Sequence, residues 1–416
     1  MKIYMVGGAV RDKILQKEVH DRDFVVTGST AEEMIALGYK KVGKHFPVFL
    51  HPQTREEYAL ARKEIKTGDG HGDFKFIFTP DITLKEDSLR RDFTCNALYQ
   101  DLETGKIIDF HNGQEDIKNH VLRHVSEHFK EDPLRVLRMC RFSAQLDFDV
   151  APETMELCHH MVDEGMLTHL SKDRIWQEFE KALSSSSFYR FIENAKECGA
   201  LAAILPEMEQ LFNVPERADY HPEKNSGAHT LLTIKAADSN DAMINYAAML
   251  HDIGKIKTDP KCWPSHRGHD ILGEEIIKNI GRRLKVPSSY TDFATFTALN
   301  HMIYHQDIKD YAKEIATVAI YISRYQHKDY LNRFIAVLKA DMHGRQKQVT
   351  AEECIKFTQF ENYLRQLTQA SCEKKTSEIA GFENLLDGIK NGSLPPSAIN
   401  EAFIETLLEE NPFVSK

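Results

Sequence analysis

The sequence predicts an α+β protein in which a head with a small mixed sheet is followed by an all-helical remainder. Short apolar runs alternate with helical segments from Lys2 to about Leu122, and the strand signal nearly vanishes beyond Ala144. The chain of 416 residues is long for a single core, so we expect two or more domains. The sheet should therefore be confined to the first part of the chain.

The composition is that of an ordinary globular protein, with 42% hydrophobic and 28% charged residues. No apolar run approaches the length of a membrane helix, and the chain begins with an apparent strand instead of a charged leader, so we expect a cytoplasmic protein without a membrane partner. The seven cysteines are scattered without CxxC pairs, a pattern that favours reduced thiols over disulfides or structural zinc.

The formal net charge of -10 argues against unspecific binding to nucleic acid, because attraction to phosphates depends on local lysine and arginine contacts. A specific RNA partner would need a local basic surface. The candidates are Arg282 and Arg283 with Lys285, and Lys374 with Lys375. A solvated helix face is the simpler interpretation of each group taken singly.

The first chemical signal follows the apolar run from Ile3 to Val6, which predicts a buried strand. Gly7 and Gly8 then allow a sharp turn whose N-H groups face outward, an arrangement that suits an anion such as phosphate. Asp21 and Asp23 are alternate residues, so in an extended segment both carboxylates project from one face. Mg2+ characteristically binds one or two carboxylates plus substrate phosphates, which points to nucleotidyl or phosphoryl transfer.

Each half of this signal has a plainer explanation. Paired glycines are usually only a turn, and an Asp-x-Asp segment is usually a solvated loop. The two occur close together here with Arg11 between them, and this combination favours a site.

The next segments of the head should form a helix and three strands. Thr30 and Glu33 match a capping box, which predicts the start of a helix. The segments from Val48 to Leu50, Glu57 to Ala61 and Lys75 to Phe78 have the character of strands.

A second signal is the pair Arg90 and Arg91 followed by Asp92. Paired arginines can bind a triphosphate bidentately, and a nearby carboxylate can accept a hydrogen bond from a ribose hydroxyl. The alternative is an ion-pair network in which either arginine pairs with Asp87 or Asp92.

A third signal is Asp132 followed by Pro133, a typical helix start with an N-cap residue and proline at the first helical position. Arg135, Arg138 and Arg141 then recur every third residue and drift slowly around the helix. Such a row of cations favours an anionic partner.

These segments together resemble one family. GGAVRD with DRD resembles motif A of the class II tRNA nucleotidyltransferases, which comprise the CCA-adding enzymes and bacterial poly(A) polymerases. Arg90 to Ala97 resembles the family's RRDxxxNA motif, and Glu131 to Arg138 resembles its EDxxR template motif. The three motifs stand in the family's order and cover roughly the first third of the chain.

The resemblance implies roles for the residues of the head. Asp21 and Asp23 would bind Mg2+, Gly8, Arg11 and Arg91 would bind the nucleotide, and Asp92 would distinguish ribose from deoxyribose. Asp132 and Arg135 would contact the edge of the base, and Arg138 and Arg141 would support the base and the phosphate.

The helical part carries a separate signature. His251 and Asp252 end an apolar helical stretch, and His229 precedes them, which resembles the H…HD…D pattern of HD-domain metal phosphohydrolases. Imidazoles with carboxylates suit a transition-metal ion better than Mg2+ alone. The resemblance implies Ni2+ or another divalent metal, and hydrolysis of 2′,3′-cyclic phosphates, 2′-nucleotides and simple phosphate esters.

Four more histidines follow the His-Asp pair: His266, His269, His301 and His305. In a chain with twenty histidines, this grouping favours a cluster at a metal over satisfied core histidines. For the closing aspartate of the HD pattern two candidates remain open. Asp341 resembles the family's late "AD" element, and Asp307 is the nearer rival.

The expected organisation has four parts. Helical patterns such as Arg174 to Ala182, Phe188 to Cys198 and Asp241 to Leu250 dominate after the head. The resemblance implies a nucleotidyltransferase head over 1–140, a helical RNA-binding neck and body over 141–222, an HD domain over 223–345 and a helical tail over 346–416.

The function implied by both signatures is addition of the 3′-terminal CCA of tRNA from CTP and ATP without a nucleic-acid template, together with phosphohydrolysis at the HD domain. One alternative is a poly(A) polymerase of the same family, although such relatives often have basic extensions that this acidic chain lacks. Another is an HD phosphohydrolase with a non-catalytic RNA-binding head. The sequence leaves open whether the protein is a monomer or a dimer.

Overall fold

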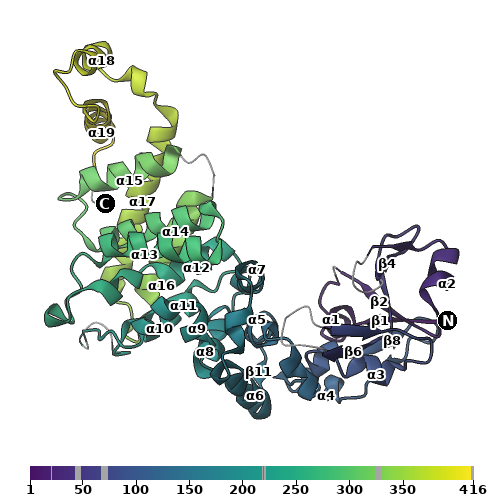
Figure 1. The fold of residues 1–416 in the computed structure, drawn as a ribbon. Coiled ribbons are helices and arrows are strands. Elements are labelled where there is room, and N and C mark those ends of the chain that lie inside the picture. The colour runs from purple at the N-terminus through teal and green to yellow at the C-terminus, as the bar shows by residue number, and fades with distance from the viewer. Residues whose placement is uncertain are drawn as a thin grey trace. The chain divides into compact units, whose positions relative to one another are not determined.

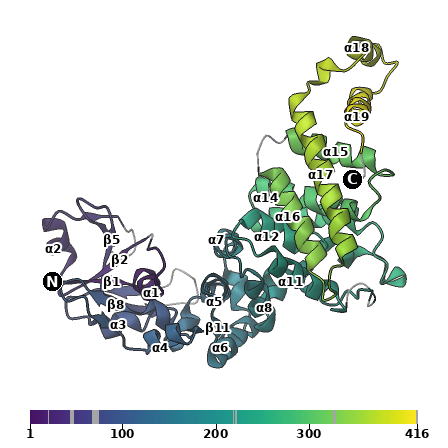
Figure 2. The ribbon, with the colours of Figure 1, turned by 180° about the vertical axis from the view of Figure 1, so that it is seen from behind.

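The structure is a computed structural model that describes residues 1–19, 21–42, 48–66, 74–217, 219, 222–324 and 329–413. It divides into two compact units, which Figure 1 and Figure 2 show from opposite sides. The first unit comprises Met1–Ala182 with Arg190–Ile204, and the second comprises Leu183–Tyr189 with Leu205–Lys416. The expected four-part division stays a prediction.

The first unit contains a seven-stranded mixed sheet, which confirms the predicted fold of the head. Strand β2 pairs antiparallel with β1 and parallel with β5. In their order across the sheet the strands are β3 (Lys40–Lys41), β4 (Val48–Leu50), β5 (Glu57–Leu60), β2 (Asp23–Thr27), β1 (Lys2–Val6), β8 (Tyr99–Asp101) and β9 (Ile107–Ile108). Two smaller sheets pair β6 (Lys63–Lys66) with β7 (Phe74–Ile77), and β10 (Val121–Leu122) with β11 (Asp149–Val150).

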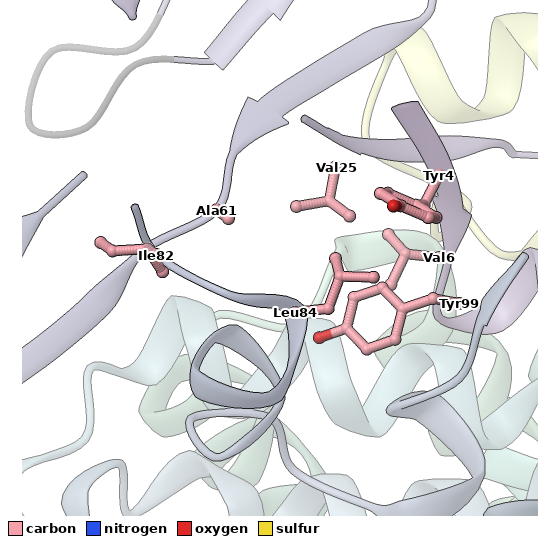
Figure 3. Packing of buried hydrophobic residues seen from close by; sticks show 7 residues of the cluster. All are labelled: Tyr4, Val6, Val25, Ala61, Ile82, Leu84 and Tyr99. Atoms are coloured by element: carbon pink, nitrogen blue, oxygen red, sulfur yellow. The ribbon is translucent and has the colours of Figure 1, made fainter. Parts of the chain in front are cut away.

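A buried apolar cluster packs the sheet against the segment that carries the arginine pair. Tyr4 and Val6 are two residues apart in β1, so both side chains project from one face of the sheet. Figure 3 shows Tyr99 of β8 beside Leu84, the first residue of helix α3 (Leu84–Ser88). This packing holds α3, which precedes the arginine pair, against strands β1 and β8. The whole cluster consists of Tyr4, Val6, Val25, Ala61, Ile82, Leu84 and Tyr99.

Two helices of the head begin at capping boxes. Thr30 and Glu33 cap α2 (Ala31–Ala36) as predicted, and Thr83 and Glu86 cap α3 in the same way. The other helices of the first unit, with 3-10 helices written η, are α1 (Gly8–Ile14), η1 (Thr94–Asn96), α4 (Gly113–Lys118), η2 (Glu127–Glu131), α5 (Leu134–Leu146), α6 (Pro152–Asp163), η3 (Met166–His169), α7 (Lys172–Leu183), α8 (Tyr189–Glu197) and α9 (Ala200–Ile204).

The second unit is mostly helical, which confirms the predicted helical remainder, and among its described residues Pro215 and Asn225 form an isolated antiparallel bridge. Helix α11 packs on α12 and α16, and α13 packs on α14 and η4. The elements are α10 (Pro206–Leu211), α11 (Ser226–Ala237), α12 (Ala242–Leu250), η4 (Ile253–Lys257), η5 (Pro260–Cys262), α13 (His269–Leu284), α14 (Ser288–Asn300), η6 (His301–His305), α15 (Ala312–Arg324), α16 (Tyr330–His343), α17 (Ala351–Glu373), η7 (Thr376–Glu378), α18 (Phe382–Lys390) and α19 (Ala398–Glu410). Within the described ranges, no helix combines the length and apolar character needed to cross a lipid bilayer.

Candidate active sites in the two units

The glycine turn lies directly between β1 and α1. Gly7 has a φ of 73°, a left-handed conformation that glycine adopts without the steric cost that other residues meet. A Cβ atom added at Gly7 would lie 3.9 Å from Nη1 of Arg91, so the turn and this guanidinium are close neighbours. In the antiparallel pairing of β1 with β2, Val6 stands opposite Asp23. The pairing therefore brings a predicted metal-binding carboxylate to the glycine turn.

The environment of Asp23 favours a nearby cation. Partial burial raises the pKa of its carboxyl above the ordinary value, Arg91 lowers it, and Asp21 raises it further. Burial and a like charge both disfavour the ionised form, and a bound metal ion would relieve both effects. Asp21 and Asp23 line the same cavity.

A third carboxylate beside this pair was not predicted. Glu57 begins β5, and the parallel pairing of β2 with β5 places it opposite Asp23. Both residues also line a small cavity of about 190 Å³ together with Arg91. The sequence predicted the strand that starts at Glu57, but nothing local in the sequence indicates which strand is its neighbour.

One cavity of about 580 Å³ in the first unit brings together the residues assigned to the head site. Its lining includes the glycine turn, both carboxylates of the DRD segment, and the arginines of α5. The predicted residues among its lining are Gly8, Arg11, Asp21, Asp23, Arg91, Asp92, Asp132, Arg135, Arg138 and Arg141. The cavity is also lined by Gly7 of the glycine turn and Arg90 of the arginine pair, and by Asn96, Leu134, Phe142 and Arg174, to which the sequence assigned no role.

The ion-pair network considered as an alternative for the arginine pair is present. The buried carboxylate of Asp87 lies 2.7 Å from Nη2 of Arg90 and 3.0 Å from Nη2 of Arg91. Both arginines nevertheless line the large cavity of about 580 Å³. Each arginine can therefore keep its ion pair with Asp87 and still face the cavity.

Asp92 has three hydrogen-bond partners, one of which is the backbone N-H of Phe93, which donates to Oδ1 at 2.8 Å. Its Oδ2 accepts a hydrogen bond from Nε of Arg138 at 2.9 Å, and its Oδ1 accepts from Nδ2 of Asn96 at 3.2 Å. Burial alone would raise the pKa of Asp92, but Arg138 outweighs it and the pKa falls to about 2. The oxygen of the Asn96 amide in turn accepts from Nη1 of Arg11 at 2.5 Å. These contacts connect the glycine-turn helix α1 with helix α5.

The start of α5 differs by one residue from the expectation. The helix begins at Leu134, and Pro133, which has no N-H, precedes it. Asp132 still caps the helix, because its Oδ1 accepts a hydrogen bond from the N-H of Leu134 at 3.1 Å. Its Oδ2 accepts from Nη2 of Arg174 at 3.0 Å, a link from α7 that the sequence did not predict. The other terminal nitrogen of Arg174, Nη1, is buried without a hydrogen-bond partner.

The three arginines of α5 have different partners. Arg135 donates to the carbonyl oxygens of His128, at 2.6 Å, and Arg90. Arg141 donates to the buried Glu178 at 2.5 Å. Arg138 and Arg141 also lie over the ring of Phe142, and so does Arg11. Their guanidinium carbons stand 5.2, 3.9 and 5.3 Å from its centroid, so one aromatic side chain gathers three cations at the cavity.

In the second unit, four buried histidine rings present one nitrogen to a common centre. In each ring Nδ1 contacts a backbone carbonyl oxygen, which can only accept, so Nδ1 carries a proton and Nε2 is the nitrogen that could bind a metal ion. The contacts are His229 to Gly344 at 3.0 Å, His251 to Ala248 at 2.8 Å, His269 to His266 at 2.7 Å and His301 to Ala298 at 2.7 Å.

Asp252 lies between two groups of these nitrogens. Its Oδ2 is 3.2 Å from Nε2 of His251 and 3.7 Å from Nε2 of His229. Its Oδ1 is 3.2 Å from Nε2 of His269 and 3.4 Å from Nε2 of His301. Two sets with metal-ligand spacing therefore share this carboxylate.

The donor geometry fits a divalent cation. Nε2 of His251 is buried and makes no hydrogen bond. Nε2 of His269 and Nε2 of His301 stand 3.1 Å apart, so two lone pairs face each other. A buried polar atom without a partner is costly, and a metal ion would satisfy both features.

The structure distinguishes the candidates that the sequence left open. Asp341 is buried, with Oδ1 3.0 Å from Nε2 of His229, whereas Asp307 is exposed and accepts a hydrogen bond from the N-H of Lys309. Of the four following histidines, only His269 and His301 join a ligand group. The prediction that His266 and His305 belong to the cluster was wrong.

The physical reason is visible for both. The two ring nitrogens of His266 are occupied by the hydroxyl of Thr258 at 2.9 Å and the carbonyl of Pro215 at 2.8 Å. His305 is exposed at the rim of the cavity.

Lys255 is a further residue that the sequence did not single out, although it stands in the same HDIGK segment. Its Nζ lies 2.7 Å from Oδ2 of Asp252 and 2.7 Å from Oε1 of Glu216. Burial lowers the pKa of Lys255, but Asp252 and Glu216 outweigh that effect and raise it above its ordinary value. A cavity of about 500 Å³ opens onto these groups, with Arg217, Arg267 and Arg345 also in its lining.

Comparison with family models finds three matches along the chain. They are the poly A polymerase head domain over residues 3–123, the probable RNA and SrmB-binding site of polymerase A over 147–212, and the HD domain over 226–331.

Solved structures of the same fold include two at low sequence identity. The Bacillus stearothermophilus CCA-adding enzyme in complex with CTP matches with a TM-score of 0.60 and 22% identity, covering 98% of this chain and 93% of that one. The Thermotoga maritima CCA-adding enzyme complexed with tRNA matches with a TM-score of 0.58 and 20% identity, covering 100% and 88%.

Curated relatives are much more similar in sequence. The multifunctional CCA protein of Vibrio vulnificus strain YJ016 is 44% identical over 83% of this chain and 86% of its own length. That of Neisseria gonorrhoeae strain NCCP11945 is 46% identical over 83% of this chain and 84% of its own. With its poly(A) polymerase head, RNA-binding and HD matches in the same chain, this protein belongs to the multifunctional CCA protein family.

Proposed function

We propose that this chain adds the 3′-terminal CCA of tRNA from CTP and ATP without a nucleic-acid template, and that its HD domain hydrolyses phosphate esters. The observation that carries the first activity is the single cavity lined by all the residues assigned to nucleotide handling. The names of the curated relatives support it, and so do the CTP and tRNA complexes of the structurally similar enzymes.

Asp21 and Asp23 would hold Mg2+, with Glu57 as a third carboxylate beside Asp23. When bound, Mg2+ supplies charge that activates the terminal 3′ hydroxyl of the tRNA and neutralises the triphosphate. The raised pKa of Asp23 supports this assignment, because a group that resists ionisation gains most from a bound cation.

The arginines around the glycine turn would bind the phosphates. Arg11 and Arg91 lie beside Gly7 and Gly8, whose turn is suited to an anion. The 3′ oxygen attacks the α-phosphorus in line, the bond from phosphorus to the bridging oxygen breaks, and pyrophosphate leaves. Held by these cations, the triphosphate would be fixed for that attack.

Asp132 and Arg135 would replace a template base. A carboxylate accepts from the exocyclic amine of cytosine or adenine, and a guanidinium donates to the adjacent ring nitrogen. Uracil and guanine have a carbonyl in place of the exocyclic amine and a ring N-H in place of the acceptor nitrogen. The hydrogen bonds to Asp132 and Arg135 would therefore both be lost. Both residues have partners within the protein, Arg174 for Asp132 and carbonyl oxygens for Arg135, so reading a base requires that these contacts be shared or exchanged.

The test is label incorporation into tRNA that lacks its CCA end, with CTP, ATP, UTP and GTP supplied separately and together. We expect incorporation of CTP followed by ATP, and rejection of UTP and GTP. A long adenosine tract would favour the poly(A) polymerase alternative. Absence of any CTP incorporation would favour a non-catalytic head.

We also propose the four-part division described above, with the head over 1–140, an RNA-binding neck and body over 141–222, the HD domain over 223–345 and the tail over 346–416. The matched family models support the first three parts, although their limits differ from these.

For the second activity we infer a divalent metal centre in the HD domain. His229, His251, Asp252 and Asp341 would hold one ion, and Asp252, His269 and His301 offer donors for a neighbouring one. Nitrogen-rich donors favour Ni2+ or a similar transition ion over Mg2+. When bound, such an ion supplies a nucleophilic water and polarises the phosphate, while Lys255 orients the shared Asp252.

Metal content tests the ligand assignment without relying on activity. Purified protein loaded with Ni2+ and desalted should retain metal by elemental analysis, and His251→Ala should lose it. His269→Ala should lower the metal content while leaving an ion at the first group. Unchanged metal content in both variants would contradict the assignment.

A further inference from the structure

We propose that Asp87, a buried carboxylate on α3, is a positioning residue for the nucleotide phosphates, which it serves by holding Arg90 and Arg91 in place. This inference rests on the proposed nucleotidyl transfer in the head. Asp87 does not line the cavity itself, and it acts only through the two arginines that do.

The contacts of Asp87 are divided between its two oxygens. Oδ1 accepts from Nε of Arg90 at 3.1 Å, from Nη2 of Arg90 at 2.7 Å and from the backbone N-H of Arg62 at 3.2 Å. Oδ2 accepts from Nη2 of Arg91 at 3.0 Å and from the hydroxyl of Tyr99 at 2.9 Å. Each arginine is therefore bound to a different oxygen of one carboxylate.

Two side chains hold the guanidinium of Arg91. Its Nη2 bonds to Asp87, and its Nε donates to the hydroxyl of Tyr99 at 3.1 Å. These contacts turn the third nitrogen, Nη1, toward the turn at Gly7.

The support itself is rigid. Tyr99 belongs to the central sheet and is fully buried in the core that Figure 3 shows, next to Leu84 at the start of α3. The side chain of Asp87 is 0% exposed, whereas those of Arg90 and Arg91 are each 16% exposed. The carboxylate is thus anchored in the core while its two arginines reach the cavity.

The charges explain why a carboxylate is needed. Two guanidiniums side by side repel each other, and Asp87 between them offsets one of the two charges. The remaining positive charge faces a cavity proposed to receive a polyphosphate. Cations that are already oriented lose little further freedom on binding, which strengthens the interaction with phosphate.

The competing explanation is purely structural: Asp87 would only connect α3 with the backbone at Arg62 and the hydroxyl of Tyr99. In that case its loss would lower stability without a selective effect on phosphate binding. The two explanations differ in what happens to pyrophosphate, which has phosphates but no base.

The decisive variant is Asp87→Asn in the full chain. Asparagine keeps the shape but has one acceptor oxygen, so it can hold only one of the two arginines. We expect the inhibition constant of pyrophosphate and the KM for CTP and ATP to rise about tenfold or more, the effect of losing roughly one charge-assisted hydrogen bond. The preference for CTP over UTP should stay unchanged, because the base is read by other residues.

Ser88→Ala is the matched control. Ser88 lies on the same helix, is equally buried, and its hydroxyl contacts the carbonyl of Lys85 and the ring of His111, both at 2.7 Å. The substitution removes a buried hydrogen-bonding group without touching the arginines, so pyrophosphate inhibition should stay at the parent value. Tyr99→Phe removes one support of Arg91 and should raise the inhibition constant in the same direction as Asp87→Asn. The effects of these two substitutions should not add in the double variant.

Pyrophosphate affinity is also measured by calorimetry in the presence of Mg2+, which does not depend on turnover. An unchanged affinity in folded Asp87→Asn would overturn the proposal, and so would an equal loss in Ser88→Ala. If Asp87→Asn does not fold, an unchanged affinity in Tyr99→Phe has the same meaning. Failure of the proposed function is recognised separately, because the parent protein would then incorporate no CTP.

Discussion

At Asp23, partial burial raises the carboxyl pKa, Arg91 lowers it and Asp21 raises it further. Asp21 is a near neighbour in the chain, whereas Arg91 is far away in the sequence and acts on Asp23 at the start of β2. The same cavity contains Asp92, whose pKa moves in the opposite direction because Arg138 binds it. Two aspartates of one cavity thus have opposite electrostatic environments, which agrees with our proposal that Asp23 and not Asp92 holds the metal ion.

We predict that Asp21→Asn and Asp23→Asn each reduce nucleotide addition by about 100-fold or more, because each removes a charge that would hold Mg2+. Phosphate-ester hydrolysis should be unaffected, since its ligands lie in the second unit. The measurement is CTP incorporation beside hydrolysis of a 2′,3′-cyclic phosphate in the same preparation. Incorporation at the parent rate in either variant would remove the metal assignment.

A second prediction concerns Asp92 and acid stability. Its folded pKa, about 2, lies below the ordinary value of 3.8, so the ionised form binds its partners more tightly in the folded state. The resulting stabilisation, about 2 kcal/mol, is present above pH 4 and is lost as the pH falls toward 2. Asp92→Asn should therefore flatten the pH dependence of the unfolding free energy below pH 4. Urea denaturation from pH 5 downward measures it, and an unchanged slope would contradict the prediction.

Among the elements, α5 and α7 together form the side of the cavity that we propose reads the base. Asp132 caps α5 and is held by Arg174 of α7, while Arg135 reaches back to the carbonyl of His128. The carboxylate that we propose reads the base therefore also caps the helix, with Oδ1 bound to the cap N-H and Oδ2 bound to Arg174.

We predict that Asp132→Ala and Arg135→Ala relax base discrimination, raising the use of UTP or GTP relative to CTP and ATP. An unmatched buried polar group costs about 1 to 3 kcal/mol. Without Asp132 or Arg135, much of the free-energy penalty for binding UTP or GTP would disappear. Relative incorporation of the four nucleotides checks this, in proteins whose melting temperature stays near that of the parent.

Arg174→Gln tests the contact between α7 and α5, because it keeps a polar side chain but removes the charge that orients Asp132. It should shift base preference in the same direction. If all three variants keep the parent preference, the protein-template assignment is wrong.

At the scale of the whole molecule, the two sites lie in separate compact units with separate ligand sets. We predict that His251→Ala and Asp252→Ala eliminate hydrolysis of 2′,3′-cyclic phosphate without reducing CCA addition. Chelation should stop both activities in the parent protein, and Mg2+ alone should restore nucleotide addition. Parallel loss of both activities in a folded variant would show that the sites are coupled.

The sequence by itself determined those features that depend on neighbouring residues. The capping box at Thr30, the strand before Gly7 and the same-face spacing of Asp21 and Asp23 all follow from local geometry. The same holds for the His251-Asp252 pair at the end of an apolar helix. These patterns were sufficient to predict a mixed head, a helical remainder and the family, because the motifs that carry the chemistry are short.

Only the tertiary structure decided which distant groups meet. Strand register places Glu57 beside Asp23, and packing of α3 on the sheet brings the hydroxyl of Tyr99 to Asp87. Nothing in the local sequence separates His269 from His266, yet one ring reaches the shared carboxylate and the other is occupied by Thr258 and a backbone carbonyl. The physical reason is that strand pairing and helix packing are long-range choices, made by burial and complementary contacts that no single segment contains.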